Sequence, residues 1–446
     1  MPVLDGSAVG NTQGTVAFCR SRQDVIAIAA GLPEAHRRLA SLSVFGIVDR
    51  LSDVAHRWLD LPDRKRCEIT AVGSAPEVDF LFSHLTQSHL QTLLKSELGD
   101  PAVLDDFRPR QTGGGFVRAF GPRCITHLFP GNVPDVAILG LVSALLVKSA
   151  SLVRIGRGDT TLPLWFVGAL REVDPTLADA CVLATWEVER SDIAQTAFEM
   201  SDCVVVYGGD ETLAAVRPLI PTGTRAIFHG HRVSFGAVAR ECCRKEVAIA
   251  VVADILAHDQ RGCLSPHLYY VEPGGPCSPL DFAEALARAL GNVCRLPPTV
   301  SSSDAARIWH LRGALPLSGG VVFQSAAGID WTVLYDPDPI FSLSPLGRTI
   351  WIKPVSDLAD IAPHLQPVRP FLQAIGLAAP PERLPHLARY FAEIGVGRIC
   401  PVGTMQRPPL TWHHDGRFRL LDLLRFVDLE TEYDIENLKI NELLLD

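Results

Sequence analysis

The sequence predicts an α/β fold built around a parallel sheet with helices on both faces. Short apolar or β-branched runs alternate with helix-like runs between residues 125 and 229. Such alternation requires crossover connections between parallel strands. The breaks at residues 131–132, 156–159 and 208–210 carry glycine and polar residues. Because ligands of such sheets bind beyond the carboxyl ends of the strands, these breaks form the predicted binding edge.

The spacing of apolar residues predicts the individual elements. The first hundred residues are polar and helical in pattern, and their clearest helix covers residues 83–98. Strands are expected at residues 125–129, 152–155, 180–184, 203–207 and 225–228, with helices near 134–147, 160–173, 191–200 and 211–219. A second α/β set follows, with a helix over 247–258, a strand at 268–271, a helix at 280–290, strands near 331–335 and 349–353, and a helix at 384–394. Residues 274–279 and 300–304 have the composition of loops.

This order of elements predicts four regions. Residues 1–104 form a mostly helical region that packs on a nucleotide-binding domain of residues 105–235. Residues 236–400 form the catalytic domain, and residues 401–446 form a C-terminal segment. At 446 residues, the chain is long enough for two or three domains with full cores.

Composition argues against several classes of protein. The net charge of −9, with no basic run longer than Arg64-Lys65-Arg66, argues against a nucleic-acid binder. The longest apolar stretch, residues 136–147, is too short to span a bilayer. Eleven cysteines without a zinc-type spacing or a signal peptide indicate reduced thiols in a cytoplasmic protein. We expect no metal, and His413-His414-Asp415 is interpreted as part of a turn at Asp415-Gly416.

Cys263 is the strongest candidate for a reactive residue. It follows the predicted helix over residues 247–258 in a loop where Gly262 gives the backbone freedom and Pro266 limits further helix. The thiol is therefore expected in the loop that follows this helix rather than inside a helix or strand. The alternative is that Cys263 is a small buried hydrophobic residue, as lone intracellular cysteines often are.

Three further groups of residues could contribute to a site. Asn132 precedes Pro134 at a predicted helix start, where its amide could face developing negative charge or simply cap the helix. His229 and His231 follow a sheet strand and could act as acid or hydrogen-bond donor. The candidates for nucleotide binding are Arg154, Arg157, Gly208, Gly209 and Asp210. For the two arginines, a solvated charged loop remains the alternative to a ribose or 2′-phosphate site.

Several motifs between residues 105 and 430 resemble those of one protein family. They are HLFPGNVP (127–134), VVVYGGDET (204–212), FHGHRVS (228–234), DQRGCLSP (259–266), RICPVGTMQRPP (398–409) and WHHDGRFRLLDLLRFVDLE (412–430). In this order they resemble the acyl-CoA reductase, or LuxC-like, family of fatty acid reductases within the aldehyde dehydrogenase superfamily. The resemblance implies an aldehyde dehydrogenase-like fold, with a Rossmann-type nucleotide-binding domain and an α/β catalytic domain.

The same resemblance implies a reaction and its partners. Cys263 matches the nucleophile that takes an acyl group as a thioester, Asn132 the oxyanion donor, and Gly208-Gly209-Asp210 the nucleotide-phosphate loop. The implied cofactor is NADPH, with NADH as the alternative, and the implied product is an aldehyde. The acyl donor would be acyl-CoA, or an acyl-protein supplied by a carrier protein or an acyl-protein synthetase. A homo-oligomer is also expected, and a non-catalytic subunit of an acyl-transfer complex is the rival interpretation.

Residues 228–234 lack the glutamate that activates water in the oxidising members of that superfamily. An acyl group on Cys263 would then have no nearby base to promote hydrolysis. We therefore expect the acyl-enzyme to persist until it is reduced.

Overall fold

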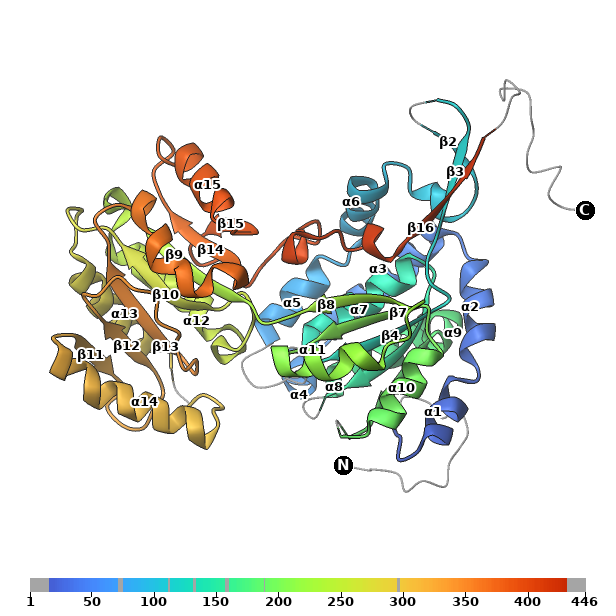
Figure 1. The fold of residues 1–446 in the computed structure, drawn as a ribbon, viewed down its shortest axis with the longest axis horizontal. Helices are drawn as coiled ribbons and strands as arrows, with labels where there is room; N and C mark the ends of the chain where they lie inside the picture. The colour runs from blue at the N-terminus through green and yellow to red at the C-terminus, as the bar shows by residue number, and fades with distance from the viewer. Residues whose placement is uncertain are drawn as a thin grey trace, which may run out of the picture. The chain divides into compact units, whose positions relative to one another are not determined.

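The computed structural model describes residues 16–70, 75–110, 113–130, 134–156, 160–187, 189–294 and 297–430. The chain forms two compact units (Figure 1). Unit 1 comprises Met1–Pro62, Leu81–His229 and Arg417–Asp446, and unit 2 comprises Asp63–Phe80 and Gly230–Gly416. The two units are therefore interleaved along the chain.

Unit 1 contains a six-stranded parallel sheet. Its strands are β1 (Ala17–Phe18), β4 (Cys124–Phe129), β5 (Ala150–Ile155), β6 (Cys181–Thr185), β7 (Cys203–Tyr207) and β8 (Arg225–His229), in the order β1-β6-β5-β4-β7-β8. All neighbouring strands are parallel. The five strands expected between residues 125 and 229 are confirmed. The short edge strand β1 lay outside the predicted set.

Helices connect and flank these strands. They are α1 (Arg22–Ala29), α2 (Leu32–Ala40), α3 (Val44–Leu59), α6 (Gln87–Leu98), α7 (Pro134–Leu146), α8 (Thr161–Val173), α9 (Pro175–Asp179), α10 (Ser191–Glu199) and α11 (Asp210–Val216). The helix expected over residues 83–98 is shorter than predicted, because α5 (Ala75–Ser83) ends first and Thr86 is extended at the start of α6.

A small antiparallel sheet joins distant parts of unit 1. It consists of β2 (Arg108–Pro109), β3 (Phe116–Phe120) and β16 (Arg425–Leu429), in the order β16-β3-β2. The chain leading into β16 is fixed by Glu97 of α6, whose carboxylate accepts the backbone N–H groups of Arg419, Leu420 and Leu421 at 3.0, 2.7 and 3.0 Å.

Unit 2 contains a seven-stranded sheet. Its strands are β9 (Val233–Val238), β10 (Pro266–Val271), β11 (Val321–Gln324), β12 (Thr332–Tyr335), β13 (Thr349–Pro354), β14 (Leu372–Ala378) and β15 (Arg398–Pro401), in the order β11-β12-β13-β10-β9-β14-β15. Only the edge strand β11 runs antiparallel to its neighbour among these strands. The strands predicted near 268–271, 331–335 and 349–353 are confirmed.

Helices and apolar loops cover both faces of this sheet, as alternation along the strands requires. On one face, Tyr269 and Val271 pack with α12 (Lys245–Leu256) and α13 (Pro279–Val293). On the other face, Leu268 and Tyr270 pack with residues of α15 (Leu384–Glu393). The predicted helices at 280–290 and 384–394 are therefore confirmed.

Two predictions for unit 2 are wrong in detail. The helix expected to continue to His258 ends at Leu256, because the next residues adopt left-handed backbone angles. Residues 300–304 are not all loop, since the Ser301 hydroxyl accepts the Asp304 N–H and caps α14 (Ser302–Ala314).

Glycines in two central strands make room for an aromatic ring. A Cβ at Gly236 of β9 would lie 1.9 Å from Cε1 of Tyr269, and a Cβ at Gly376 of β14 would lie 2.8 Å from Sδ of Met405 and 3.3 Å from the Tyr269 hydroxyl. The Tyr269 ring is fully buried. These two glycines therefore allow Tyr269 of β10 to lie across the neighbouring strands.

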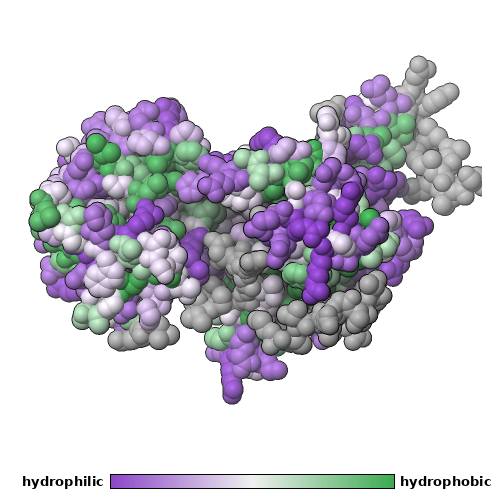
Figure 2. Space-filling model, turned by 60° about the horizontal axis from the view of Figure 1, so that its bottom comes forward, coloured by the Kyte–Doolittle hydropathy of each residue, from purple (hydrophilic) through white to green (hydrophobic). Residues whose placement is uncertain are grey.

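On the face drawn in Figure 2, hydrophobic residues lie in separate patches among hydrophilic ones. Among the described residues, no helix has the length and apolar character needed to cross a bilayer.

Candidate active site

Cys263 lies in the turn between α12 and β10, and it is exposed in the structure. The chain reaches it through three consecutive residues in left-handed conformation, His258 (φ 52°), Asp259 (φ 51°) and Gln260 (φ 64°). Each such residue with a side chain costs about 1–2 kcal/mol in backbone strain. Surrounding contacts must therefore hold the turn in place.

Two buried side chains of the turn supply those contacts. The Asp259 carboxylate accepts hydrogen bonds from Nε and Nη2 of Arg348 at 3.0 and 2.6 Å. The Gln260 amide donates to the carbonyls of Pro266 and Thr349, both at 2.8 Å, and accepts the Thr349 N–H at 2.9 Å. The turn is thus tied to the first residues of β10 and β13.

Hydroxyl groups fix the backbone of Cys263 itself. Ser234, at the start of β9, donates to the Cys263 carbonyl at 2.8 Å, and its oxygen accepts the Ala374 N–H at 3.3 Å. The Ser265 hydroxyl accepts the Gly262 N–H at 3.2 Å and a bond from the Gln406 amide at 3.0 Å. The position of Cys263 relative to β9 and β14 is therefore set by buried groups on strands.

A glutamine side chain lies against the thiol. Nε2 of Gln373, in β14, donates to Sγ of Cys263 at 3.9 Å, a hydrogen bond of the length that sulfur allows. Gln373 is 3% exposed. A polar group buried to this degree usually serves a specific contact, since burial without partners is costly.

A buried carboxylate organises the neighbouring loop. Asp254 of α12 accepts hydrogen bonds from the Tyr269 hydroxyl at 2.7 Å and from the N–H groups of Gly403 and Met405 at 2.7 and 2.8 Å. Burial raises the pKa of Asp254 to about 6, although these hydrogen bonds and the charge of Arg398 oppose the change. Arg398 donates to the carbonyls of Thr404 and Met405, so the same loop is held from two sides.

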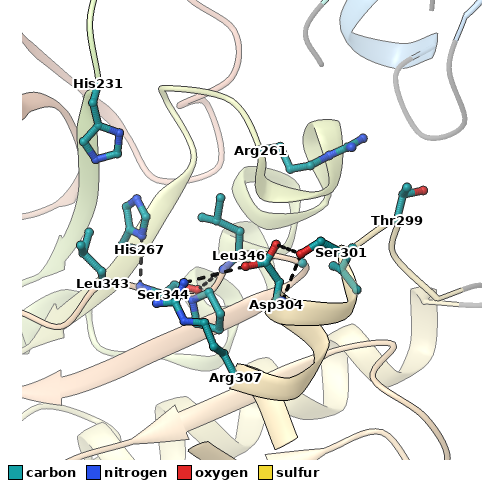
Figure 3. A pocket seen from close by; sticks show the side chains of 13 residues that line it. His231, Arg261, His267, Thr299, Ser301, Asp304, Arg307, Leu343, Ser344 and Leu346 are labelled. Atoms are coloured by element: carbon teal, nitrogen blue, oxygen red, sulfur yellow. Dashed lines mark hydrogen bonds and ion pairs between the residues drawn. The ribbon is translucent and has the colours of Figure 1, made fainter. Parts of the chain in front are cut away.

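A cavity of about 520 Å³ lies in unit 2, at the sheet edge where β9, β10 and β13 begin (Figure 3). Its lining includes Arg261, two residues before Cys263, with His231, His267, Asp304 and Ser344. Burial, followed by the charge of His231, lowers the pKa of His267 to about 4. Because Nδ1 of His267 accepts the Ser344 N–H at 3.1 Å, the neutral ring carries its proton on Nε2. The cavity is therefore lined by two imidazoles and by the guanidinium groups of Arg261 and Arg307, which suit a polar ligand.

The two histidines named by the sequence lie in different units. His231 lines the cavity of unit 2, and its ring lies 5.9 Å from that of Phe371. His229 ends β8 in unit 1 and stacks on Tyr207, with ring centroids 4.2 Å apart. Only His231 therefore shares a described cavity with residues next to Cys263.

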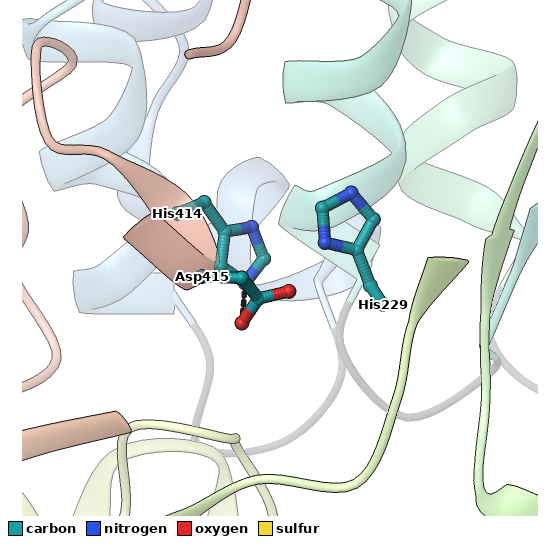
Figure 4. A group of neighbouring side chains, drawn as sticks. All are labelled: His229, His414 and Asp415. Carbon is teal, nitrogen blue, oxygen red and sulfur yellow. Dashed lines mark ion pairs between the residues drawn. The ribbon is translucent and has the colours of Figure 1, made fainter. Parts of the chain in front are cut away.

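The histidine pair near the C-terminal region lies at a turn, as predicted. Asp415 has φ 56° inside the short helical turn His414–Gly416 and is 2% exposed at its side chain. Its carboxylate pairs with Nε of Arg232 at 2.8 Å and lies 3.9 Å from Nε2 of His414 (Figure 4). Arg232 thus compensates the charge of this buried carboxylate.

The predicted nucleotide edge lies in unit 1. Gly208 and Gly209 connect β7 to α11, which begins at Asp210, and Arg154 stands in β5 on the other side of β4. An added Cβ at Gly209 would meet no atom within 4 Å, so this backbone is open to an approaching group. Arg154 donates to the Trp186 carbonyl at 3.2 Å. Asn132 and Arg157 lie outside the described residues.

These features fit a nicotinamide nucleotide. An uncovered backbone at Gly209 suits a phosphate, and the exposed Asp210 carboxylate suits ribose hydroxyls. Arg154 supplies a cation on the opposite side of β4.

Comparison with known proteins identifies the fold. Aldehyde dehydrogenase 21 from Physcomitrella patens superposes with a TM-score of 0.71 at 12% identity, covering 94% of this chain and 92% of that one. Lactaldehyde dehydrogenase from Escherichia coli gives 0.70 at 12% identity, with 92% of each chain covered. The fold is therefore aldehyde dehydrogenase-like, as the resemblance implies.

The family model of acyl-CoA reductase (LuxC) matches residues 39–426. The chain belongs to this family. Among LuxC relatives, the long-chain acyl-protein thioester reductase of Aliivibrio fischeri is 25% identical over 410 residues, covering 88% of this chain and 84% of that protein. Long-chain acyl-protein thioester reductase 2 of Photobacterium leiognathi is 23% identical, covering 96% and 93%.

The structure of this LuxC-family chain adds residues that sequence reasoning missed. Gln260 and Asp259 stand inside the motif DQRGCLSP, but the motif alone does not show that they hold a strained turn. Gln373 had a weak signal, because it is the one polar residue in the strand sequence LQAIGLA. Asp254 had a similar signal as a carboxylate inside an apolar helix.

Proposed function

We propose that the chain reduces an acyl thioester to an aldehyde through a covalent thioester on Cys263. The observation that carries this proposal is the exposed Cys263 on a turn that buried groups hold rigidly, in a chain of the LuxC family. We assign nucleotide binding to unit 1 and acyl chemistry to unit 2. NADPH is the proposed cofactor, with Arg154 and Arg157 as the residues that would read its 2′-phosphate.

The chain's own residues would carry out acyl transfer as follows. The Cys263 thiolate attacks the carbonyl carbon of the donor thioester, a C–S bond forms, and the bond to the donor sulfur breaks. The departing thiolate takes a proton, for which His231 is the proposed donor in unit 2, with His229 as the alternative in unit 1. Asn132 is the proposed donor to the oxyanion.

Reduction completes the reaction. When bound, a reduced nicotinamide nucleotide would supply a hydride to the acyl carbon. Collapse of the resulting oxyanion releases the aldehyde and returns the Cys263 thiolate. Because residues 228–234 contain no carboxylate to activate water, the thioester on Cys263 should persist rather than hydrolyse.

The acyl donor is proposed to be a long-chain acyl thioester on coenzyme A or on a protein. The family is described as acyl-CoA reductase, whereas the curated relatives are named for acyl-protein thioesters. Incubation with a fatty acyl-CoA, or with a fatty acyl carrier protein, separates the two donors.

The decisive experiment is a mass measurement without cofactor. Incubation with an accepted donor should add one acyl mass, which peptide mapping should place on Cys263, and NADPH should then release aldehyde. Cys263→Ala should remove the adduct, whereas Cys67→Ala, at another exposed cysteine of the same unit, should keep it. Free acid without cofactor, or an adduct on another residue, would refute the proposal.

A further inference from the structure

Gln373 is a buried polar residue in a strand whose other residues are apolar. It stands in β14 between buried apolar residues, and its own side chain is 3% exposed. Within the described part of the chain, its Oε1 is buried without a hydrogen-bond partner. Leaving a buried carbonyl unsatisfied costs about 1–3 kcal/mol, a cost that leucine at this position would avoid.

Among the described residues, the nitrogen of the Gln373 amide donates its hydrogen bond to the proposed nucleophile. Nε2 lies 3.9 Å from Sγ of Cys263. We propose that Gln373 is a catalytic residue that donates this hydrogen bond to the Cys263 thiolate and so increases the thiolate fraction. The inference rests on the proposed function only in naming the reaction that the thiolate serves.

The backbone geometry keeps the amide and the sulfur in register. The Ser234 hydroxyl donates to the Cys263 carbonyl and accepts the N–H of Ala374, the residue after Gln373. The Gln373 carbonyl accepts the Gly397 N–H at 2.9 Å. Both partners are therefore fixed by strand backbone and by one buried hydroxyl, which is how a functional contact is kept within reach.

Other charged or titratable groups of unit 2 lie on the elements around Cys263. Arg261 and His258 belong to the turn that carries Cys263, and His231 stands just before β9. Arg398 of β15 is paired in register with Ala374, and Asp254 of α12 compensates it electrostatically. These groups remain in place when Gln373 is replaced. A change in the pH midpoint of Cys263 alkylation can therefore be attributed to the loss of the Gln373 amide.

The test measures the pH dependence of Cys263 alkylation by iodoacetamide. In this reaction the thiolate forms a C–S bond and iodide leaves, while the thiol proton is lost to water. A Cys67→Ser background removes a second exposed thiol, and peptide mapping assigns the product. Gln373→Leu should raise the pH midpoint by about 1 unit, a tenfold loss of rate below the midpoint. Gln373→Glu should raise it further, because a carboxylate then faces the thiolate.

Gln195→Leu is the matched control, since that amide lies on α10 of unit 1 and bonds Glu199 at 3.0 Å. It should leave the midpoint unchanged. Midpoints within about 0.3 unit of wild type in both Gln373 variants would overturn the inference. If Gln373→Leu fails to fold, Gln373→Glu and Gln373→Met decide the question in the same way. Because alkylation needs neither thioester nor cofactor, a chain that shows the shift but forms no acyl-enzyme would contradict the proposed function and leave this inference standing.

Discussion

At the residue scale, the turn before Cys263 depends on side chains that satisfy a strained backbone. Three left-handed residues in succession cost several kcal/mol in total, about 1–2 kcal/mol each. Gln260 offsets part of this cost with three buried hydrogen bonds to two strands. Such a turn places the sulfur with little freedom to move, which suits a nucleophile that must meet a carbonyl carbon.

We therefore predict that Gln260→Leu lowers the free energy of unfolding by about 2–4 kcal/mol, because three buried hydrogen bonds to Pro266 and Thr349 are lost. Urea unfolding measures the loss. Gln195→Leu, which removes an exposed amide, should change stability by less than about 0.5 kcal/mol. Equal stability of the two variants would show that the amide of Gln260 does not hold the turn.

Asn132 gives a second prediction at this scale. If its amide stabilises the oxyanion, Asn132→Ala should lower kcat for aldehyde formation by roughly 100-fold with little change in melting temperature. If Asn132 only caps the helix, the variant should instead lose about 1 kcal/mol of stability while its rate changes little. Steady-state kinetics and thermal unfolding, measured on the same preparation, separate these outcomes.

At the scale of elements, most strands and helices of the parallel sheets follow from apolar periodicity. The strands β4, β5, β6, β7 and β8 are short apolar runs between helix-like runs, which is why the sequence predicts them. The same pattern does not predict β9 and β14, since each contains a glycine that usually weakens a strand. Those glycines are explained by the side chains of Tyr269 and Met405 that lie against them, which are contacts between residues far apart in sequence.

The residues of the candidate site also fall into those that the sequence predicts and those that only the folded structure identifies. Cys263 could be named from its loop and from family motifs, because both are local in sequence. Gln373 and Ser234 could not, since their roles depend on strands β14 and β9 starting at the edge where the turn before β10 lies. Pairing order within a sheet is a property of the folded chain.

Gly236 provides a prediction at this scale. Gly236→Ala should destabilise the protein by about 3 kcal/mol or more, because the new Cβ would lie 1.9 Å from the buried Tyr269 ring. Gly313→Ala, on α14 where an added Cβ meets nothing within 4 Å, should stabilise by about 0.5–1 kcal/mol. Thermal unfolding of the two variants tests the contrast, and a tolerated Gly236→Ala would show that Tyr269 can move aside.

At the scale of the whole molecule, one buried carboxylate should govern part of the acid stability. Glu272 ends the β10 region and is fully buried, and it accepts bonds from Arg383, from the Leu358 N–H and from Arg240. Burial alone would raise the pKa of Glu272, but these bonds outweigh it and lower the pKa from 4.5 to about 2. The stabilisation is therefore complete above pH 4.5 and is lost as the pH falls through 2.

We predict that Glu272→Gln loses about 3 kcal/mol of unfolding free energy at neutral pH, and that the difference from wild type shrinks below pH 4.5. Urea unfolding over a pH series provides the measurement. Asp192→Asn is the control, because that carboxylate pairs with Arg190 at the exposed surface, where solvent screens the interaction. If the loss of unfolding free energy in Glu272→Gln did not change with pH, the loss would come from altered packing of the side chain and not from its missing charge.

The interleaved path of the chain has a consequence for synthesis on the ribosome. Strand β3 leaves the ribosome early, yet its partner β16 and the backbone that satisfies Glu97 follow only after all of unit 2. The nascent chain must therefore carry an unpaired strand edge while the second unit folds. Slow release of the last segment, or its loss by early termination, would leave that edge open to pairing with other chains, so the yield of active protein should depend on what shields β3 during translation.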